Sequence, residues 1–271
     1  MGCAKSERGF KMNIIGIIPA RMASSRFPGK PMSKICGIPM VGHVYFRSKM
    51  CKALTDVYVA TCDKEISDYM ERIKGKAVMT ASSHQRASDR AAEAVLKIEK
   101  ESGKKADIVV MIQGDEPLIR PEMIDAAIEP ILKDRAVNIT NLMAALKTIE
   151  GFEDPNEVKV VVDKDNNALY FSREPIPSRK KGAADVPMMK QVCIIPFRRD
   201  FLLEYTKMPP TPLEVIESVD MMRILENGLK VKMVPTKFDT KSVDTMQDLE
   251  VASRMMEKDA LYKRYSSKGT A

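Results

Sequence analysis

Apolar residues in the first half of the chain form short continuous runs, and amphipathic segments separate these runs. The runs predict strands near residues 13–19, 56–61, 76–80 and 107–112. The segments predict helices near residues 39–51, 64–73, 87–102 and 121–134. Short apolar strands that alternate with helices indicate an α/β fold built on a doubly wound, mostly parallel sheet.

The pattern changes in the middle of the chain. There β-like runs follow one another with turn signals such as DKDNN between them: NITNLMAAL, VKVVVD, ALYFS and CIIPF. Helical patterns return near residues 212–226 and 245–258. We therefore expect one domain over residues 12–260, with a β-rich excursion at about residues 150–200. An extension at residues 1–11, expected to be disordered, and a C-terminal tail at residues 261–271 flank it, and the last residues of the tail, SSKGTA, are expected to be frayed.

The first apolar run leads directly into a basic loop, IIPARMASSRFPGKP at residues 17–31. Ligands of open α/β sheets collect beyond the carboxyl ends of the strands, so this loop lies where substrates bind. Gly29 allows close backbone approach, and the three cations Arg21, Arg26 and Lys30 suit a nucleoside triphosphate. The alternative is a solvated basic loop with no ligand. Three cations within ten residues after a buried strand favour the phosphate site.

Two carboxylates also follow apolar strands. Asp115 stands in QGDEP at the end of the run DIVVMIQ, and Asp244 stands in SVDT after KVKMVP. Mg²⁺ usually binds proteins through one or two carboxylates together with substrate phosphates and water. The pair therefore predicts a magnesium site. The alternatives are a turn residue after Gly114 for Asp115 and a helix N-cap for Asp244.

Composition narrows the range of partners. The net charge of +7 and the pI of about 9.0 would suit an anionic partner, but the basic residues are scattered and no nucleic-acid recognition motif is present. No apolar run approaches the length of a membrane span, so no stable membrane association is expected. The five cysteines lack metal-type spacing and their number is odd, which fits a reducing cytoplasm. MGCAKS matches a loose N-myristoylation pattern, although we interpret it as part of the extension.

Six stretches resemble the 3-deoxy-manno-octulosonate cytidylyltransferase (CMP-Kdo synthetase) family and keep the same order along the chain. They are PAR with SSRFPGKP, MTASSH with DR at 89–90, QGDEP, DPNEVKVV, ALYFSREPIP and SVDTMQDLE. Together they cover almost everything from Asn13 to about Met256. The resemblance implies a Rossmann-like nucleotidyltransferase that moves CMP from CTP to the anomeric hydroxyl of an acidic 3-deoxy-2-ketoacid sugar, for lipopolysaccharide biosynthesis. It also implies Mg²⁺ and a cytoplasmic homodimer whose β-rich excursion holds the acceptor.

The resemblance also implies roles for individual residues. The residues that it implies for nucleotide binding are Ala20, Arg21, Ser25, Arg26, Lys30, Ala81, His84, Arg90 and Asp115. The catalytic groups among them are Arg21, Arg26, Lys30 and Asp115, and the metal ligands are Asp115 and Asp244. The acceptor residues are Gln113, Arg173, Gln191 and Glu214.

Some of these residues have a second interpretation from the sequence alone. Arg173 could bind a sugar carboxylate or form a structural ion pair. Glu214 could accept from a sugar hydroxyl or serve as an acid in the first turn of a helix. Asn156 and Lys159 of DPNEVK would pass as surface residues without the resemblance.

The chain departs from the family pattern in the acceptor region. Arg86 and Ala87 stand where small, flexible residues are expected, and Gln191, Ile195 and Met221 stand where the family has His, Tyr and a polar residue. A buried polar site rejects analogues that leave its groups unpaired, and apolar replacements remove that demand. We therefore expect the preferred acceptor to be less hydroxylated than 3-deoxy-manno-octulosonate, or otherwise modified.

Besides a nucleic-acid-binding module, which only the basic pI suggests, two alternative functions stay open at this stage. One is a nucleotidyltransferase that uses another base or a phosphate or phosphonate acceptor. The other is a non-catalytic nucleotide-binding protein, which the presence of both acids and all three cations disfavours.

Overall fold

The structure is a computed structural model, and it describes residues 12–23, 27–181 and 185–269. The extension expected at residues 1–11 lies outside the described residues, as do Ser25 and Arg26 of the basic loop. The chain divides into two compact units. The first consists of the residues up to Asp125 and those from Thr240 onward, and the second is Ala126–Asp239.

The first unit is built on parallel strands, as the apolar runs predict. They are β1 (Ile14–Ala20), β4 (Asp56–Thr61), β5 (Ala77–Met79) and β6 (Ile108–Ile112). Their order in the sheet is β6-β1-β4-β5, and every pair is parallel. All five residues of β6 are buried, which is why this run carries no alternation of polar and apolar positions.

The predicted helices of this unit connect the strands. They are α1 (Met40–Lys49), α2 (Lys64–Arg72) and α3 (Ala87–Ser102). Strands are added in one direction from β1 to β5, and the chain then returns to place β6 on the other side of β1. Because crossovers are right-handed, this reversal puts α3 on the opposite face from α1 and α2. The point of reversal lies between the carboxyl ends of β1 and β6, where doubly wound folds bind their ligands.

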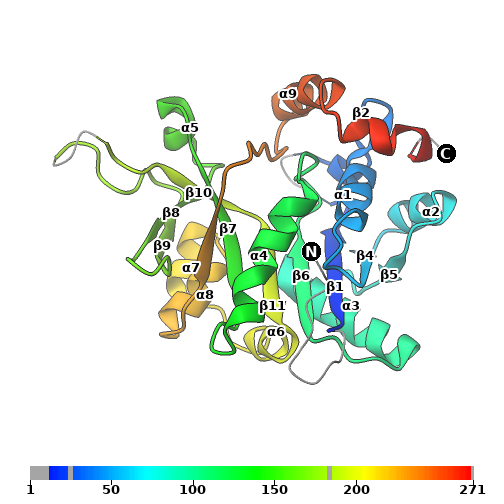
Figure 1. Cartoon of the computed structure of the whole chain (residues 1–271), viewed down its shortest axis with the longest axis horizontal. Coiled ribbons are helices and arrows are strands. Elements are labelled where there is room, and N and C mark those ends of the chain that lie inside the picture. Colours follow the sequence, from blue (N-terminus) through cyan, green and yellow to red (C-terminus); the bar gives the residue numbers. More distant parts are fainter. Residues whose placement is uncertain (1–11, 24–26, 182–184, 270–271) are drawn as a thin grey trace. The chain divides into compact units, whose positions relative to one another are not determined.

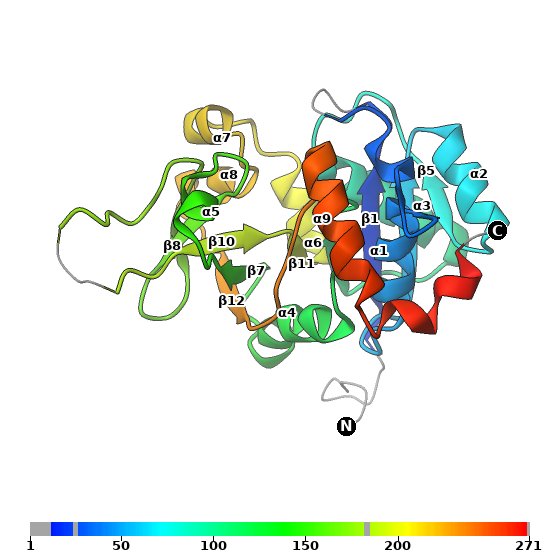
Figure 2. The same cartoon turned by 90° about the horizontal axis from the view of Figure 1, so that it is seen from above.

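The C-terminal segment returns to this first unit. Helix α9 (Met246–Glu257) and the 3-10 turns η2 (Tyr262–Arg264) and η3 (Ser266–Lys268) lie beside α1 and the short hairpin of β2 (Lys34–Ile35) and β3 (Ile38–Pro39), as Figures 1 and 2 show. Arg47 of α1 explains this docking. Its guanidinium donates to the Tyr265 hydroxyl at 2.9 Å, to the Ile119 carbonyl at 3.1 Å and to Asp259 at 2.9 Å.

His43 lies on the same face of α1 and is completely buried. Its Nε2 is 2.8 Å from the Ile35 carbonyl oxygen, which can only accept, so this nitrogen carries the proton. Nδ1 then accepts from the Tyr265 hydroxyl, also at 2.8 Å. Burial lowers the pKa of His43 to about 4, and the positive charge of Arg47 acts in the same direction.

This histidine makes folding stability sensitive to mild acid. The unfolded chain takes up a proton at His43 near pH 6.5, whereas the folded protein does so only near pH 4. Stability is therefore lost as the pH falls from 6.5 towards 4. We expect the free energy of unfolding to be about 2.5 kcal/mol lower at pH 4.5 than at pH 7.5. Urea unfolding at both pH values measures the difference, and the variant His43→Gln should lose most of it; equal pH dependence in both proteins would contradict this account.

The second unit contains a mixed sheet with the strand order β12-β7-β10-β8-β9. These strands are β7 (Thr140–Ala145), β8 (Lys159–Val162), β9 (Ala168–Ser172), β10 (Met189–Val192) and β12 (Lys232–Thr236). Only the pairing of β12 with β7 is parallel among the pairs described for this sheet. The other elements that enter this unit are α4 (Pro121–Lys133), within which the boundary falls, and α5 (Ile149–Glu153), β11 (Ile194–Arg198), α6 (Arg199–Tyr205), α7 (Pro212–Glu217) and α8 (Met221–Glu226).

The β-rich middle predicted from the sequence is confirmed, but the helical pattern at 212–226 is not one helix. It breaks at Ser218, which has φ 51 and ψ 47 and so ends α7 in the left-handed region. Helix α8 then begins at Met221 and packs beside β9, as Figure 1 shows. None of the helices in the described ranges has the length and apolar character that crossing a bilayer requires.

Candidate active site

The carboxyl ends of β1 and β6 approach each other closely where the predicted site residues lie. A Cβ atom added to Gly114 would be 3.2 Å from the Pro19 carbonyl oxygen, so a side chain here would crowd the end of β1. Ala20 is buried at the end of β1, and Arg21 follows it as an exposed residue. Gln113 and Asp115 leave β6 in the turn around Gly114 and are half-buried. The sheet thus brings Ala20, Gln113 and Asp115 to one edge.

The basic loop returns to this edge at Lys30. Gly29 has φ +73, a conformation that strains any residue with a side chain, and its N–H donates to the Met22 carbonyl at 3.0 Å. The short turn η1 (Lys30–Met32) follows. The Lys30 Nζ lies 2.8 Å from Asp115 Oδ2 and 3.2 Å from Asp244 Oδ1. Three residues that the sequence places in one phosphate and metal site therefore lie in direct contact.

Asp244 reaches this contact because its segment is joined to that of Asp115. The Val243 N–H donates to the Asp115 carbonyl oxygen at 2.9 Å. The N-cap of α9 is Thr245, which forms a capping box with Asp248. The alternative interpretation of Asp244 as the N-cap is therefore wrong, and its carboxylate is directed to Lys30 instead.

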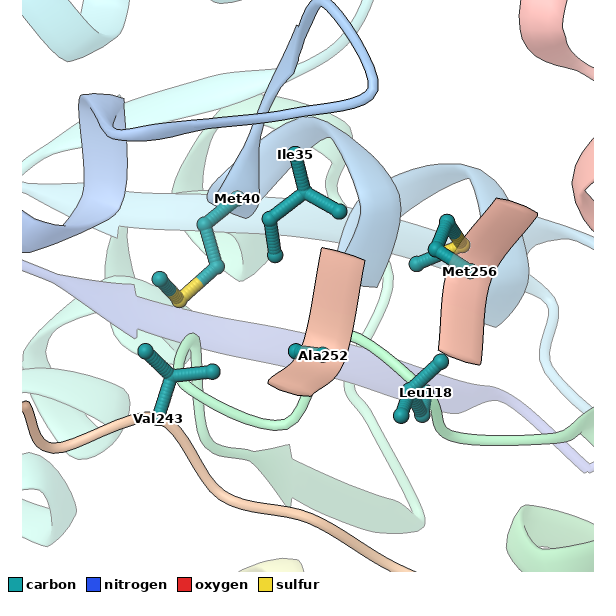
Figure 3. Close-up of a cluster of buried hydrophobic side chains, with 6 residues drawn as sticks. All are labelled: Ile35, Met40, Leu118, Val243, Ala252 and Met256. Atoms are coloured by element: carbon teal, nitrogen blue, oxygen red, sulfur yellow. The ribbon is translucent and has the colours of Figure 1, made fainter. Parts of the chain in front are cut away.

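An apolar cluster supports the three segments that carry these side chains. Figure 3 shows Ile35, Met40, Leu118, Val243, Ala252 and Met256 packed together, and all are at most 6% exposed. Ile35 follows Lys30, Leu118 follows Asp115, and Val243 precedes Asp244. The relative positions of the ammonium and the two carboxylates thus rest on buried packing as well as on charge.

The two acids also determine the charge of Lys30. Burial alone would lower the pKa of this lysine, but the attraction and hydrogen bonds of Asp115 and Asp244 raise it above its usual value. Lys30 is therefore an ammonium at any physiological pH. One positive charge faces two negative charges in this group.

This group of oxygens fits a magnesium ion that also binds a nucleotide. The side chains of Asp115 and Asp244 are 20% and 14% exposed, so both carboxylates remain accessible. No set of three or more His, Cys, Asp or Glu side chains is arranged to hold a metal within the described ranges. Two carboxylates supply the share of ligands that Mg²⁺ takes from a protein when phosphate oxygens and water complete its shell.

A second group of predicted nucleotide residues surrounds the loop between β5 and α3. The Arg90 guanidinium is 2% exposed and donates to the Thr80 hydroxyl and to the Ala81 carbonyl oxygen. The Ala81 N–H donates to Glu93 Oε2 at 2.9 Å, and the same oxygen contacts His84 Nε2. Ala81, His84 and Arg90 are thus brought together, with Arg90 holding the loop from inside.

Glu93 is a residue that the sequence interpretation missed. Burial opposes its ionisation, but hydrogen bonds from Lys97, Ala81 and His84 lower the pKa of Glu93 to about 2. The spacing in the sequence could have identified Glu93. It lies three residues after Arg90 and therefore on the same face of α3.

The predicted acceptor residues of the second unit have structural partners. The Arg173 guanidinium donates to three backbone carbonyl oxygens, those of Glu217 at 2.8 Å, Pro155 at 2.8 Å and Ser218 at 3.3 Å. The Glu217 carboxylate accepts from the Tyr170 and Ser172 hydroxyls and from the Arg173 N–H. Among the residues that the structure describes, no carboxylate pairs with the Arg173 guanidinium, and the acceptor role assigned to Arg173 stays a prediction.

Glu214 and Gln191 are also held by neighbours. Glu214 is 1% exposed and accepts from the Arg223 Nε and Nη2 atoms at 2.8 Å each, and it also closes the capping box of α7 with Thr211. Gln191 on β10 donates to Asn141 Oδ1 at 2.6 Å, and Asn141 donates to the Leu142 and Val192 carbonyl oxygens. The acceptor roles of both residues stay predictions.

Lys159 differs from its sequence interpretation. It would pass as a surface residue, yet it is completely buried in β8 and donates to the Asp154 and Arg173 carbonyl oxygens. Burial lowers the pKa of this lysine. On the neighbouring strand Lys190 is also buried and pairs with Glu157 at 3.0 Å. Lys159 thus links the DPNEVK segment to the backbone at Arg173.

Comparison with known proteins agrees with this geometry. The 3-deoxy-manno-octulosonate cytidylyltransferase of Geobacter metallireducens is 41% identical over 249 residues, which are 88% of this chain and 96% of that protein. The protein of the same name from Geobacter sulfurreducens is 43% identical over 249 residues, again 88% of this chain and 97% of its own length. The solved structure of CMP:2-keto-3-deoxy-manno-octonic acid synthetase complexed with CTP superimposes with a TM-score of 0.82 at 35% identity, covering 91% of this chain and 99% of that one.

A more distant structure shows the fold alone. The 4-diphosphocytidyl-2C-methyl-D-erythritol synthase from Anaerococcus prevotii matches with a TM-score of 0.59 at 15% identity. The family model described as cytidylyltransferase matches residues 15–233. With this match and with relatives more than 40% identical over most of its length, the chain belongs to the cytidylyltransferase family and, within it, to the 3-deoxy-manno-octulosonate cytidylyltransferases.

Proposed function

We propose that the protein transfers CMP from CTP to the anomeric hydroxyl of a 3-deoxy-2-ketoacid sugar and releases pyrophosphate. The observation that carries this proposal is the direct contact of Lys30 with both Asp115 and Asp244 at the carboxyl edge of the parallel sheet. This contact supports the proposal, because a lysine ammonium suits phosphate oxygens and two carboxylates suit Mg²⁺. The named relatives and the structure solved with CTP supply the nucleotide and the acceptor class.

The residues of the first unit would perform the phosphoryl chemistry mainly by position and charge. Asp115 and Asp244 would hold Mg²⁺, which neutralises triphosphate charge and polarises the α-phosphoryl group when it is bound. Arg21 and Lys30 lie on the loop after β1 and would bind phosphate oxygens, as would Arg26, which lies outside the described residues. The attacking hydroxyl and the phosphorus need only be aligned, because no covalent intermediate with the protein is required.

The loop between β5 and α3 would hold the cytosine. Its backbone is fixed by Arg90 and Glu93 from α3, so the carbonyl and amide groups between Ala81 and His84 keep one arrangement. A preorganised set of backbone donors and acceptors can discriminate between bases without rearranging on binding. Cytosine selection would thus depend on Arg90 and Glu93, which hold the loop backbone and need not contact the base themselves.

The proposal includes a homodimeric, cytoplasmic enzyme of lipopolysaccharide biosynthesis. Apolar side chains on the second unit support a dimer interface there. Leu169 on β9 and Val215 and Ile216 on α7 are 61%, 64% and 72% exposed. The Tyr170 and Glu217 side chains hydrogen-bond to each other at 3.2 Å, so these two segments lie close together. Large apolar side chains that are exposed in one protomer are candidates for burial against a second one.

A substrate panel tests the proposed reaction. Purified protein is supplied with Mg²⁺, one of the four ribonucleoside triphosphates and one of several 3-deoxy-2-ketoacid sugars, and pyrophosphate release is measured. We expect turnover with CTP to exceed that with UTP, ATP or GTP by at least about a hundredfold, because a site built to hydrogen-bond one base rejects the others strongly. Sugar 1-phosphates are added to the panel as the competing acceptor class. Pyrophosphate release only with sugar 1-phosphates, or no release with any acceptor of the panel, would refute the proposal.

The same panel tests the acceptor preference. Gln191, Ile195 and Met221 replace the polar groups usual in the family, so an acceptor with fewer hydroxyls or a modified tail should have the higher kcat/KM. If unmodified 3-deoxy-manno-octulosonate has a higher kcat/KM than every analogue, the altered preference is wrong and the cytidylyl transfer still holds.

A further inference from the structure

Lys30 has two possible partners in the proposed reaction, and the structure shows one of them. A cation on the basic loop can bind phosphate oxygens, but here its ammonium lies within hydrogen-bonding distance of both proposed metal ligands, 2.8 Å from Asp115 and 3.2 Å from Asp244. All three side chains are at most 20% exposed. The charge of Lys30 therefore acts on the two carboxylates with little screening by solvent.

The ammonium supplies the positive charge between the two carboxylates that a bound metal ion would otherwise supply. It draws the two acids together and satisfies one oxygen of each. A divalent cation that entered without nucleotide would meet this positive charge beside both of its ligands. The divalent cation would bind only weakly, because it would either have to displace the Lys30 ammonium or bind beside it against electrostatic repulsion.

The triphosphate of CTP changes this balance. It brings several negative charges to the loop, and the flexible four-carbon stem of a lysine allows its ammonium to move from the carboxylates to phosphate oxygens. The same phosphates also complete the oxygen shell of the metal. Departure of Lys30 and entry of the metal are then two parts of one event.

We propose that Lys30 is the internal counter-ion of Asp115 and Asp244 in the nucleotide-free protein, and that it prevents a divalent metal from binding there until CTP arrives. This inference rests on the proposed function, since it takes the two acids as metal ligands. It adds that metal binding is coupled to nucleotide binding: the protein without nucleotide binds no metal at these carboxylates, and the metal binds together with CTP.

The experiment measures Mn²⁺ binding in the absence of nucleotide, by the loss of the electron paramagnetic resonance signal of free Mn²⁺. We expect Lys30→Gln to bind Mn²⁺ about tenfold or more tightly than the wild type, because an adjacent positive charge is removed from both ligands. Lys30→Arg should bind as weakly as the wild type. Lys34→Gln is the matched control, since Lys34 is exposed on the neighbouring strand β2, and its Mn²⁺ affinity should not change.

A second measurement uses the wild-type protein and does not depend on how well the variants fold. Mn²⁺ alone should leave its melting temperature almost unchanged, whereas Mn²⁺ with CTP should raise it by more than CTP alone. The proposal is overturned if Lys30→Gln binds Mn²⁺ no more tightly than the wild type, or if Mn²⁺ alone stabilises the wild type as much as Mn²⁺ with CTP. Neither readout requires turnover, so failure here is distinct from failure of the substrate panel.

Discussion

Replacing Asp115 by Asn is expected to lower kcat by about three to four orders of magnitude, equivalent to about 4–5.5 kcal/mol of transition-state stabilisation. Asn has nearly the same size but no negative charge, so the proposed metal site would lose a ligand that the neighbouring turn cannot replace. Lys30 keeps Asp244 as a partner at 3.2 Å, and the fold should therefore persist. Pyrophosphate release at saturating CTP and Mg²⁺ measures the loss, and circular dichroism with thermal melting checks the fold.

Asp244→Asn should have a similar effect, because Asp244 shares the same ammonium and the same backbone link to Asp115. Glu122→Gln is the matched control. It also removes one carboxylate close to Asp115 in sequence, but Glu122 is exposed in the first turn of α4 and should leave kcat unchanged. Near-normal rates in both Asp variants, with unaltered magnesium dependence, would remove these residues from the metal site.

The largest expected effect on stability concerns Glu214. Its side chain is 1% exposed and that of Arg223 is 3% exposed, and the two form a bidentate pair at 2.8 Å. Removing one partner of a buried pair leaves the other charge uncompensated, so Glu214→Met should lower the free energy of unfolding by about 3–5 kcal/mol. The double variant with Arg223→Met should recover part of this loss, because no isolated charge remains.

Urea denaturation measures these differences. Glu129→Met is the control, since its pair with Lys133 is 58% and 71% exposed on the two sides and contributes at most about 1 kcal/mol. This experiment also separates the two interpretations of Glu214. A Glu214→Gln protein that keeps wild-type stability but shows a much higher KM for the acceptor sugar would identify Glu214 as an acceptor ligand instead.

The sequence predicted the first unit well because its strands are buried on both faces. Runs such as IVVMI admit no polar residue, and this makes both their position and their parallel pairing recognisable. The meeting of Lys30 with Asp115 follows from the same pattern, since the carboxyl ends of neighbouring parallel strands share one edge. The contribution of Asp244 was predicted from its position after the apolar run KVKMVP, from the need of magnesium for a second carboxylate and from the family resemblance.

Prediction from the sequence failed for side chains whose hydrogen-bond partners are backbone atoms or residues of distant segments. Lys159 interrupts an apolar run, and nothing local indicates that two carbonyl oxygens would receive its ammonium. The break between α7 and α8 depends on Ser218 adopting a positive φ, which the composition around it does not signal. Arg173 was recognised as important, yet its guanidinium donates to carbonyl oxygens that no side-chain pattern reveals.

The C-terminal segment joins the first unit only late in the chain, and this has a consequence for the synthesis of the protein on the ribosome. Lys30 and Asp244 are 214 residues apart, so a ribosome working at ~5–20 residues per second needs roughly 10–40 s to travel from one to the other. During that interval the nascent chain holds Lys30 and, later, Asp115, but not the acid that completes the group. A chain released early would lack Asp244 together with the Val243, Ala252 and Met256 side chains of the apolar cluster. With Asp244 in the role proposed for it, incomplete translation products would not consume CTP, and activity would begin only when the last helix has left the ribosome and docked.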